Sequence, residues 1–307
     1  MKLQILLATY NSEKFLRQQI DSILSQDYQD FQLLIRDAGS TDSTMQIISD
    51  YTRKYPEKIC FTEQGKADAC QNFFRLMELS DADILMFSDH DDVWLTDKIS
   101  RTVKSYQQNE NKYGRNCPIL VFTDSKVTDK NLNILNPSMF ACQHLNAVDC
   151  SFAKLVVQNT ASGNTMLINR ALKELVLPPP HNAVMHDHYL MLAASAFGKI
   201  ILLNEPTLLY RQHGKNVLGA VNYSIPYFLQ KLLGGRKEIV ERFNRNIIQA
   251  EEFYHINKEK LSAETAEFLL ELSTFRKMNF IAKRSFLLRK KMFKSGLLRN
   301  VGMFLLI

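Results

Sequence analysis

Short apolar runs alternate along the first hundred residues with longer segments in which apolar residues recur every three or four positions. The run LQILLA and the segment SEKFLRQQIDSILS that follows it soon after are the first such pair. Strands that alternate with helices at this spacing are typical of βαβ units, in which helices cover both faces of a parallel sheet. Strands are therefore predicted at residues 3–8, 31–35, 59–62 and 84–87, and helices at 12–25, 41–55, 67–79 and 96–108.

The second half of the chain has a less regular pattern. Strands are predicted at residues 119–122, 165–168 and 199–203, and helices at 152–158, 170–176 and 186–197. From about residue 225 the apolar spacing is helical to the end, with helices at 241–257 and 263–280 before the last segment. Ser12 and Asp42 stand where the first two helices are expected to begin, and each is predicted to cap its helix.

The composition places the chain among ordinary globular proteins. Its 307 residues are 46% hydrophobic and 23% charged, which is enough for one large α/β domain with an appendage. Apolar runs stay well short of the roughly 18 residues of a spanning helix. The N-terminus lacks the pattern of a signal peptide, so a cytoplasmic protein is predicted. The five scattered cysteines form no C-x-x-C pair and are predicted to be buried free thiols.

The formal charge of +6 is unevenly distributed. Residues 276–307 contain nine Lys and Arg residues and no acid, interleaved with Phe, Leu, Met and Ile. A basic amphipathic helix of this kind suits the anionic inner surface of a cell membrane. It equally suits a helix that packs on the α/β domain or on a second subunit, so both interpretations stay open. No nucleic-acid partner is expected.

Polar residues gather where the predicted strands end. The first strand ends in TYN, the second in RDAGSTD and the fourth in SDHDD. Ligands of an open parallel sheet bind outside the carboxyl ends of its strands, so these three stretches are expected to converge on one crevice. The sequence has no glycine-rich dinucleotide or P-loop motif that would bind phosphate there.

The stretch FSDHDDVW places Asp89, Asp91 and Asp92 within four positions. Carboxylates this close repel one another unless a positive charge lies among them. Mg²⁺ or Mn²⁺ would supply that charge, because these ions favour carboxylate and phosphate oxygens. For Asp92 alone, the N-terminus of the helix expected from residue 96 is an equally good partner.

Three stretches, ATYNSEKFLRQQIDSILSQ, IRDAGSTDST and FSDHDDVW, together resemble the N-terminal half of the family 2 inverting glycosyltransferases with the GT-A fold. The resemblance is clear over residues 3–110. It continues through ASGNTMLINR, MHDHYLMLAASAFGKI and LYRQHGKNVLG, which are similar to bacterial rhamnosyltransferases of cell-wall and capsule synthesis. It implies an α/β fold of the GT-A type, with a mostly parallel sheet flanked by helices and a C-terminal helical extension.

The resemblance also implies a division of the chain. Residues 1–220 would form the catalytic domain, with the nucleotide-sugar half at 1–110 and the acceptor half at 111–220. Residues 221–307 would form the helical region, basic and amphipathic at its end. A homo-oligomer is compatible with this organisation.

By the same resemblance, the donor nucleotide lies against the ends of the first two strands. Thr9, Tyr10 and Asn11 would border its base and ribose, and Asp37 would accept a hydrogen bond from the pyrimidine N–H. The family usually has a second acid directly after the first, where this chain has Ala38. This difference puts the affinity for the donor in doubt.

The metal and the diphosphate would be held by two distant stretches. The resemblance makes Asp91 and Asp89 ligands of Mn²⁺ or Mg²⁺, with Asp89 also facing ribose oxygens of the donor. His213 would reach the metal or the diphosphate. Arg211 would pair with phosphate oxygens, for which a guanidinium is well suited. The loop from residue 210 to 219 would close over the donor.

An inverting transfer also requires a base that takes the proton of the acceptor hydroxyl. The family's base is an acid at the start of a helix, and Asp187 in MHDHYLML fits that place. A purely structural role as a helix cap is the alternative. The predicted acceptor and sugar pocket contains Trp94, Gly163, Asn164 and His188, although Trp94 is as well explained by core packing.

The sequence thus predicts a metal-dependent inverting glycosyltransferase, placed peripherally at the cytoplasmic face of the membrane. A dTDP-sugar, above all dTDP-L-rhamnose, is the favoured donor, and a UDP-sugar is the second candidate. The acceptor would be a lipid-linked glycan or an oligosaccharide. Two alternatives remain: a catalytically degenerate member that binds sugar nucleotide or acts as a scaffold, and a nucleotidyltransferase, which normally needs a glycine-rich basic signature that LATYNSEKF lacks.

Overall fold

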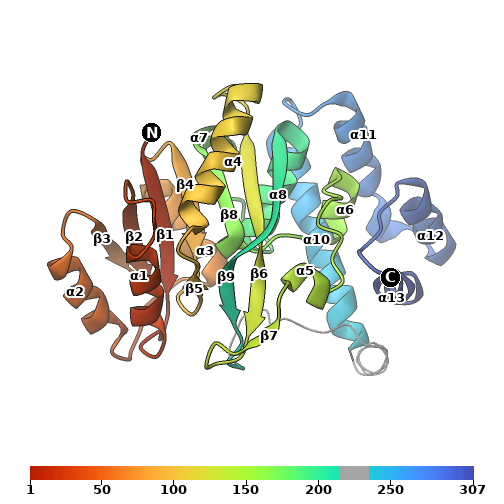
Figure 1. Ribbon diagram of the computed structural model, residues 1–307. Coiled ribbons are helices and arrows are strands. Elements are labelled where there is room, and N and C mark those ends of the chain that lie inside the picture. Colours follow the sequence, from red (N-terminus) through yellow and green to blue (C-terminus); the bar gives the residue numbers. More distant parts are fainter. Residues whose placement is uncertain (215–234) are drawn as a thin grey trace.

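The computed structural model of the chain describes residues 1–214 and 235–307. At its centre lies one mixed sheet with the strand order β3-β2-β1-β4-β8-β6-β9-β5, and β7 pairs with β6 (Figure 1). The strands are β1 (Leu3–Thr9), β2 (Gln32–Asp37), β3 (Ile59–Gln64), β4 (Ile84–Ser88), β5 (Val93–Trp94), β6 (Ile119–Thr128), β7 (Ile134–Asn136), β8 (Met166–Asn169) and β9 (Lys199–Arg211).

Most strands of the sheet run in one direction. β1 pairs in parallel with β2 and β4, β2 with β3, and β6 with β9, whereas β8 is antiparallel to β4 and β6. The short strands β5 and β7 are also antiparallel to their neighbours. The predicted α/β fold with a mostly parallel sheet is therefore confirmed.

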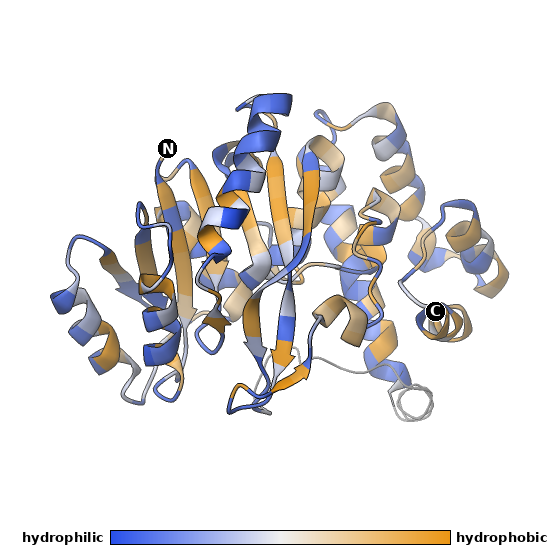
Figure 2. Cartoon of the chain, viewed as in Figure 1, coloured by the Kyte–Doolittle hydropathy of each residue, from blue (hydrophilic) through white to orange (hydrophobic). Residues whose placement is uncertain are grey.

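Helices cover both faces of this sheet because alternate strand residues face opposite apolar layers. In β1, Leu6 belongs to a core shared with α3 (Ala69–Leu79), whereas Ile5 and Leu7 belong to a core shared with α1 (Leu16–Leu24), α2 (Thr44–Lys54) and α4 (Lys98–Tyr113). All seven residues of β1 are buried, and Figure 2 shows the strands as the most hydrophobic part of the molecule. Burial on both faces explains why the strands appear in the sequence as continuous apolar runs.

Several element boundaries differ from the sequence prediction. The first helix begins at Leu16, so the prediction that Ser12 caps it is wrong: Ser12 lies in a preceding turn, where its carbonyl accepts the N–H groups of Phe15 and Leu16. The N-cap position of α2 is Ser43 and not Asp42 as predicted, although the Oδ1 of Asp42 accepts the N–H of Thr44, the first residue of α2, at 3.0 Å. β6 and β9 continue for six and eight residues beyond their predicted ends.

The C-terminal helices pack on helices that cover the second half of the sheet. They are α10 (Arg236–Asn257), α11 (Ala263–Leu272), the 3-10 turn η2 (Phe275–Lys277), α12 (Phe280–Arg289) and α13 (Leu297–Leu306). Phe243, Ile247 and Phe253 of α10 share one apolar core with α8 (His186–Phe197) and α6 (Phe152–Val157). The predicted domain boundary at residue 220 lies outside the described residues.

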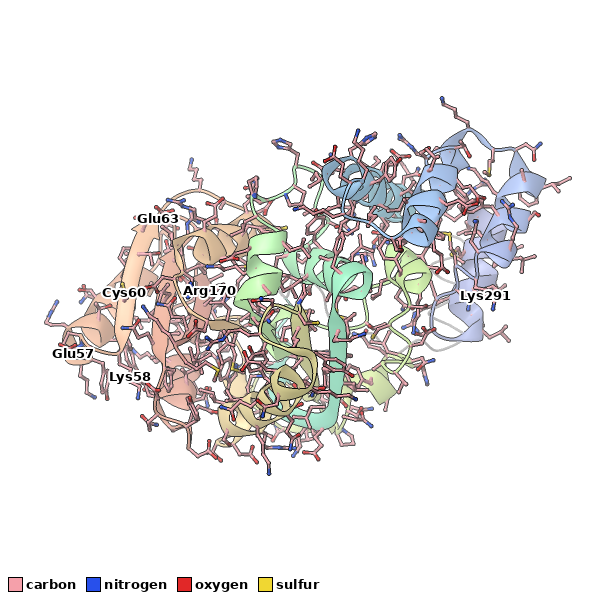
Figure 3. The ribbon with its side chains drawn as sticks, turned by 90° about the horizontal axis from the view of Figure 1, so that it is seen from above. Glu57, Lys58, Cys60, Glu63, Arg170 and Lys291 are labelled. Carbon is pink, nitrogen blue, oxygen red and sulfur yellow. The ribbon has the colours of Figure 1, made fainter. Side chains whose placement is uncertain are left out.

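The basic C-terminal segment forms two helices, where the sequence indicated one amphipathic helix. A turn ends α12, and Gly296 stands before α13 with a φ of 83°, a conformation that favours glycine. Seen from above in Figure 3, Lys291 in this turn lies at the end of the molecule opposite Glu57 and Lys58, which precede β3. No helix within the described residues is long and apolar enough to cross a membrane.

All five cysteines are free thiols, as predicted. The prediction that they are buried is wrong for Cys60, which is exposed on the edge strand β3, while Cys70 on α3 is buried. Cys60 lies at an edge because β3 ends the strand order, and no other strand of the described residues pairs with its outer side.

Candidate active site

The ends of β1, β2 and β4 lie side by side. Thr9 pairs with Asp37 across β1 and β2, and Leu7 pairs with Ser88 across β1 and β4. The acidic loop, residues 89–92, follows Ser88 directly. The polar stretches that the sequence placed at strand ends therefore meet at one edge of the sheet.

Asp37 is completely buried and accepts five hydrogen bonds. Its Oδ1 accepts the N–H groups of Gly39 and Ser40 and the Nε2 of Gln64, and its Oδ2 accepts the hydroxyls of Thr9 and Ser40. Burial raises the pKa of the Asp37 carboxyl, but these hydrogen bonds more than reverse that effect and leave the pKa lowered. This carboxylate organises the β2 turn, and a pyrimidine N–H would have to replace one of the present donors.

Tyr10 and Asn11 are exposed beside this turn, where a nucleotide could contact them. Asn11 has a left-handed φ of 46°, and its Oδ1 accepts the N–H of Thr41 at 2.9 Å. Thr9, in contrast, is buried and its hydroxyl is bonded to Asp37 at 2.9 Å. Tyr10 and Asn11 therefore present side chains at the surface, whereas Thr9 supports them from within.

His213 and Asp91 are in contact although 122 residues separate them. The Nε2 of His213 lies 2.7 Å from the Oδ2 of Asp91, and the imidazole packs on the Phe15 ring at 4.9 Å. Asp89 is half-buried, and its pKa is raised to about 8 by burial, by the charge of Asp91 and by that of Asp187. Two carboxylates and an imidazole thus lie close together at the strand ends.

These three side chains have the donor chemistry of a site for a hard divalent ion. Carboxylate oxygens suit Mn²⁺ and Mg²⁺, and imidazole nitrogen is an accepted additional ligand. Asp89 and Asp91 disfavour each other's charge, which a cation would offset. Within the described residues no three acidic, histidine or cysteine side chains are already arranged to ligate an ion, so binding requires a shift of the His213–Asp91 pair.

Asp92 links three segments of the chain, which the sequence did not reveal. It is completely buried, and its Oδ2 accepts the amide of Asn164 while its Oδ1 accepts the N–H of Arg211 at 3.2 Å. Burial and the neighbouring acids Asp91 and Asp89 raise the pKa of Asp92 well above its usual value. Asp92 holds the acidic loop to the two segments, and the alternative of a helix N-terminus is wrong because α4 begins only at Lys98.

Arg211 is a buried side chain that supports the acidic loop. It is 3% exposed, its Nε donates to the carbonyl of Asp91 at 2.8 Å, and its Nη2 donates to the Oε1 of Gln18 at 2.6 Å. The guanidinium also lies 4.6 Å from the centre of the Phe15 ring. A phosphate contact would compete with these bonds. The rest of the predicted closing loop, from residue 215, lies outside the described residues.

Asp187 is the second residue of α8 and faces the acidic loop. It is 8% exposed, and its Oδ2 accepts the N–H of Gly163 at 3.1 Å while its Oδ1 accepts the N–H of His188 at 2.6 Å. Burial raises the pKa of Asp187 to about 6, although its backbone hydrogen bonds oppose this effect. Its charge is close enough to raise the pKa of Asp89. The carboxylate is thus held in one orientation and can accept a proton near neutral pH.

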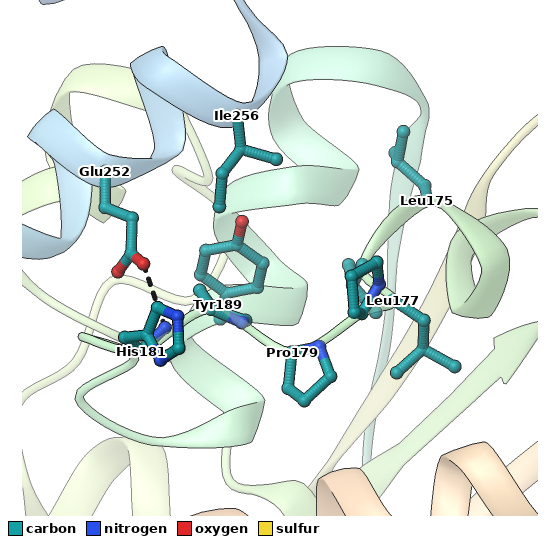
Figure 4. A pocket seen from close by; sticks show the side chains of 10 residues that line it. Leu175, Leu177, Pro179, His181, Tyr189, Glu252 and Ile256 are labelled. Carbon is teal, nitrogen blue, oxygen red and sulfur yellow. Dashed lines mark hydrogen bonds between the residues drawn. The ribbon is translucent and has the colours of Figure 1, made fainter.

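The loop before Asp187 is anchored on α10. Glu252 accepts the N–H groups of His181 and Asn182 at 2.9 and 2.7 Å, and Gln249 accepts that of Val184 at 2.8 Å. A cavity of about 260 Å³ lies at this anchor, and Figure 4 shows the side chains that line it. It is lined by Leu175, Val176, Leu177, Pro178, Pro179, Pro180, His181, Tyr189, Glu252 and Ile256. Neither Asp187 nor the acidic loop lines this cavity, so it is separate from the strand-end site.

The residues predicted for the acceptor and sugar pocket lie in two different surroundings. Gly163 and Asn164 form the 3-10 turn η1 (Gly163–Thr165), which contacts Asp187 and Asp92. Trp94 is 3% exposed in the core, with the Lys98 ammonium 4.8 Å from its ring centre. His188 is 4% exposed, and its Nε2 lies 2.5 Å from the carbonyl of Leu155. Of these four predicted residues, only Gly163 and Asn164 contact Asp187 or the acidic loop.

Gly163 is the one position of η1 where a larger residue is expected to disrupt the site. A Cβ there would lie 2.4 Å from the Nε2 of His186 and 2.9 Å from its Cε1. We expect Gly163→Ala to lower stability by about 1–3 kcal/mol, as overpacking does, and to lower turnover by displacing the N–H that holds Asp187. Thermal unfolding and a turnover assay measure the two effects.

Gly65→Ala is the matched control for that variant. The nearest atom to a Cβ at Gly65 is the Nη2 of Arg36 at 3.1 Å, the far end of a flexible side chain. Its stability is expected to change by less than about 1 kcal/mol. Equal stability of the two variants would contradict the tight contact between Gly163 and His186.

Comparisons with known proteins identify a matching family and several similar proteins. Residues 4–162 match the family model described as glycosyl transferase family 2. The dTDP-rhamnosyl transferase RfbG of Shigella flexneri is 28% identical over 231 residues, which are 70% of this chain and 74% of RfbG. The uncharacterized glycosyltransferase alr2836 of Nostoc is 25% identical over 226 residues, which are 70% of this chain and 66% of that protein.

Two solved structures resemble the whole chain in fold. TarS 1-349 of Staphylococcus aureus, in complex with UDP-GlcNAc, has a TM-score of 0.53 and 16% identity, with 99% of this chain and 90% of TarS 1-349 covered. The mannosyltransferase PcManGT of Pyrobaculum calidifontis, in complex with GDP-Man and Mn²⁺, has a TM-score of 0.52 and 12% identity, with 94% and 86% covered. Identities this low support a common fold and nothing finer.

Proposed function

The chain belongs to glycosyltransferase family 2 and transfers a sugar from a nucleotide sugar, and on this premise we propose that the strand-end site does so with inversion at the anomeric carbon. The GT-A-like α/β fold agrees with the membership. The donor we propose is dTDP-L-rhamnose, with a UDP-sugar as the second candidate. RfbG, named as a dTDP-rhamnosyl transferase, supports rhamnose, while TarS and PcManGT were solved with UDP-GlcNAc and GDP-Man.

The position of Asp187 is the observation that carries this proposal. Its buried carboxylate faces the acidic loop and is held by the N–H of Gly163. The acceptor hydroxyl gives its proton to Asp187 as its oxygen bonds to the anomeric carbon, on the side opposite the departing diphosphate. A single displacement of this kind inverts the configuration, as in inverting glycosidases.

Asp91, Asp89 and His213 are the residues that would hold a divalent metal ion. When bound, such an ion offsets the negative charge of the diphosphate as it leaves. Arg211 keeps the acidic loop in place through the carbonyl of Asp91, and Asp92 ties the loop to η1. In this proposal Thr9, Tyr10, Asn11 and Asp37 form the nucleotide side of the site.

A donor screen tests the function. Release of nucleoside diphosphate is measured from dTDP-rhamnose, UDP-GlcNAc and GDP-mannose, with lipid-linked glycan acceptors and with Mn²⁺, Mg²⁺ or a chelator. We expect release from dTDP-rhamnose that depends on both acceptor and metal. Release from another donor would overturn the rhamnose assignment, and activity that withstands the chelator would overturn the metal site.

We propose further that the C-terminal face binds the anionic cytoplasmic surface of the membrane that carries the acceptor. This face comprises the exposed apolar residues of α12 and α13, namely Phe280, Ile281, Leu288, Leu297, Val301 and Leu305. The two helices adjoin, since the Nε of Arg284 donates to the carbonyl of Phe304 at 2.9 Å. Arg276 pairs with Glu251, and Arg289 and Lys290 pair with Glu271, but residues 276–307 contain nine basic residues and no acid, so the region carries a net positive charge. Apolar side chains among basic residues suit such a surface.

Placing acids on this face should release the protein from membranes. We expect the double variant Leu297→Glu, Leu305→Glu to bind vesicles of phosphatidylglycerol and phosphatidylcholine at least about tenfold more weakly, because two exposed leucines lose their apolar burial. Cosedimentation measures binding, and Ile134→Glu, Leu135→Glu on β7 is the control, with two exposed apolar residues elsewhere on the surface. Equal binding of wild type and variant, or a dimer that the variant dissociates, would favour a second subunit on this face.

A further inference from the structure

Two side chains beside Asp187 have hydrogen-bonding atoms without partners. His186 is 4% exposed and has no partner for Nδ1 or Nε2, and Asn164 is 1% exposed and has none for Oδ1. In the described part of the chain five buried side-chain atoms lack a partner, and these two residues supply three of them. Buried polar atoms are nearly always paired, so such a cluster requires an explanation.

The two residues lie at η1, the turn that links the acidic loop to Asp187. Asn164 donates to Asp92 through Nδ2, and its neighbour Gly163 donates to Asp187. The ring of His186 lies against Gly163, because a Cβ on that glycine would be 2.4 Å from Nε2. In an inverting displacement the anomeric carbon lies between the departing diphosphate and the base. The transferred sugar must therefore pass directly along η1.

The unpartnered atoms match hydroxyl groups better than phosphate. The His186 ring packs on Phe73 at 4.1 Å and on Phe87 at 5.3 Å, and burial lowers its pKa to about 3. The imidazole is thus neutral, with one acceptor nitrogen and one N–H donor. The Oδ1 of Asn164 is an acceptor. A phosphate offers only acceptors to this pair, whereas a sugar hydroxyl both donates and accepts.

We propose that His186 and Asn164 form a hydroxyl-binding subsite for the transferred sugar, beside Asp187. This inference rests on the proposed function. Both residues are covered in the structure, so this proposal includes a local rearrangement of the side chains over them when the sugar enters. A donor whose hydroxyls match regains the missing hydrogen bonds, while one that lacks a hydroxyl leaves buried groups unpaired, which is a strong source of discrimination.

The test compares His186→Phe with wild type for a nucleoside diphosphate and for its sugar conjugate. Phenylalanine keeps a flat ring between Phe73 and Phe87 but removes both nitrogens. Dissociation constants for dTDP and dTDP-rhamnose are measured by the fluorescence of Trp94, the single tryptophan. We expect about tenfold weaker binding of dTDP-rhamnose, unchanged binding of dTDP, and a higher Tm because two unpaired buried nitrogens are gone.

Equal effects on both ligands, or none on either, would overturn the subsite. If wild type shows no binding of dTDP-rhamnose but binds UDP-GlcNAc, the two proteins are compared with UDP and UDP-GlcNAc in place of the dTDP ligands. The same outcomes then support or overturn the subsite. Failure of wild type to bind any nucleoside diphosphate would overturn the proposed function and the subsite together, whereas binding without a loss in His186→Phe overturns the subsite alone.

A second measurement is made on the wild-type protein, and a variant serves only to assign its signals. The ¹⁵N chemical shifts of the histidine rings are recorded with dTDP and then with dTDP-rhamnose, and the His186 signals are identified as those missing from His186→Gln. We expect the His186 nitrogens to shift by several parts per million only with the sugar conjugate, as a hydrogen bond forms. Shifts that are the same with both ligands would overturn the proposal.

Discussion

Replacing Asp187 with asparagine is expected to lower turnover by about 10³-fold, within the 10²–10⁴ range for general base catalysis. Asparagine keeps the size of the side chain and an oxygen that can accept the N–H of Gly163, but it cannot take up the proton of the acceptor. The dissociation constant for the nucleotide sugar should change by less than about threefold, because Asp187 acts on the acceptor. Initial rates and donor titrations separate the two quantities.

Asp83→Asn is the control for this variant. Asp83 lies before β4, at the opposite end of the strand from the acidic loop, and accepts the N–H of Lys2 at 2.8 Å. Its turnover should match that of wild type. Full activity of Asp187→Asn would show that another group is the base. A wild type that binds donor but never turns over would instead favour a scaffold, the alternative that Ala38 raises.

The pH dependence of the wild type provides an independent check on Asp187. Burial raises the pKa of this carboxyl to about 6, above its ordinary value of 3.8, so the proton is lost only as the pH passes 6. The base is active when deprotonated. We therefore expect log kcat/KM to rise with a slope of about one up to pH 6 and to be constant above it. If log kcat/KM instead became constant already above about pH 4, the base would be a solvated carboxylate, which would contradict the assignment.

The sequence predicted the fold well because its strands are buried on both faces. The apolar runs around Leu6, Leu34 and Leu85 predict central strands of a sheet that is covered on both faces, and these residues are buried there. The short strands β5 and β7 were not predicted, because two or three residues show no periodicity. The predicted end of β9 was too early, because Asn204, Glu205 and Pro206 interrupt its apolar pattern.

The candidate site could be predicted only as a set of separate stretches. Each polar cluster follows its own strand, but the contact of His213 with Asp91 depends on how β9 pairs with β6 and β5. The roles of Asp92 and Arg211 as buried supports follow from three-dimensional packing that no local pattern encodes. Likewise, the unpaired state of His186 is a property of its neighbours Phe73 and Gly163, which are distant in sequence.

Replacing Asp91 with asparagine is expected to lower turnover by about 10²–10³-fold, equivalent to the several kcal/mol that a metal ion contributes at a leaving group. Asparagine can still face the Nε2 of His213 but lacks the charge that holds a divalent ion. The Mn²⁺ concentration for half-maximal activity should therefore rise more than about tenfold, since one anionic ligand is lost. His90→Ala is the control, because His90 adjoins Asp91 in the sequence but is not a predicted metal ligand.

The Mn²⁺ requirement distinguishes a metal ligand from a purely structural partner of His213. If Asp91 served only to hold His213, Asp91→Asn would lower the Tm and the rate but leave the Mn²⁺ requirement unchanged. His213→Gln would then reproduce both effects, because it breaks the same 2.7 Å contact. If Asp91 is the main ligand, His213→Gln raises the Mn²⁺ requirement less than Asp91→Asn does, since it removes a neutral ligand and leaves both carboxylates in place. The rank order of the two variants in a manganese titration thus decides which role the contact has.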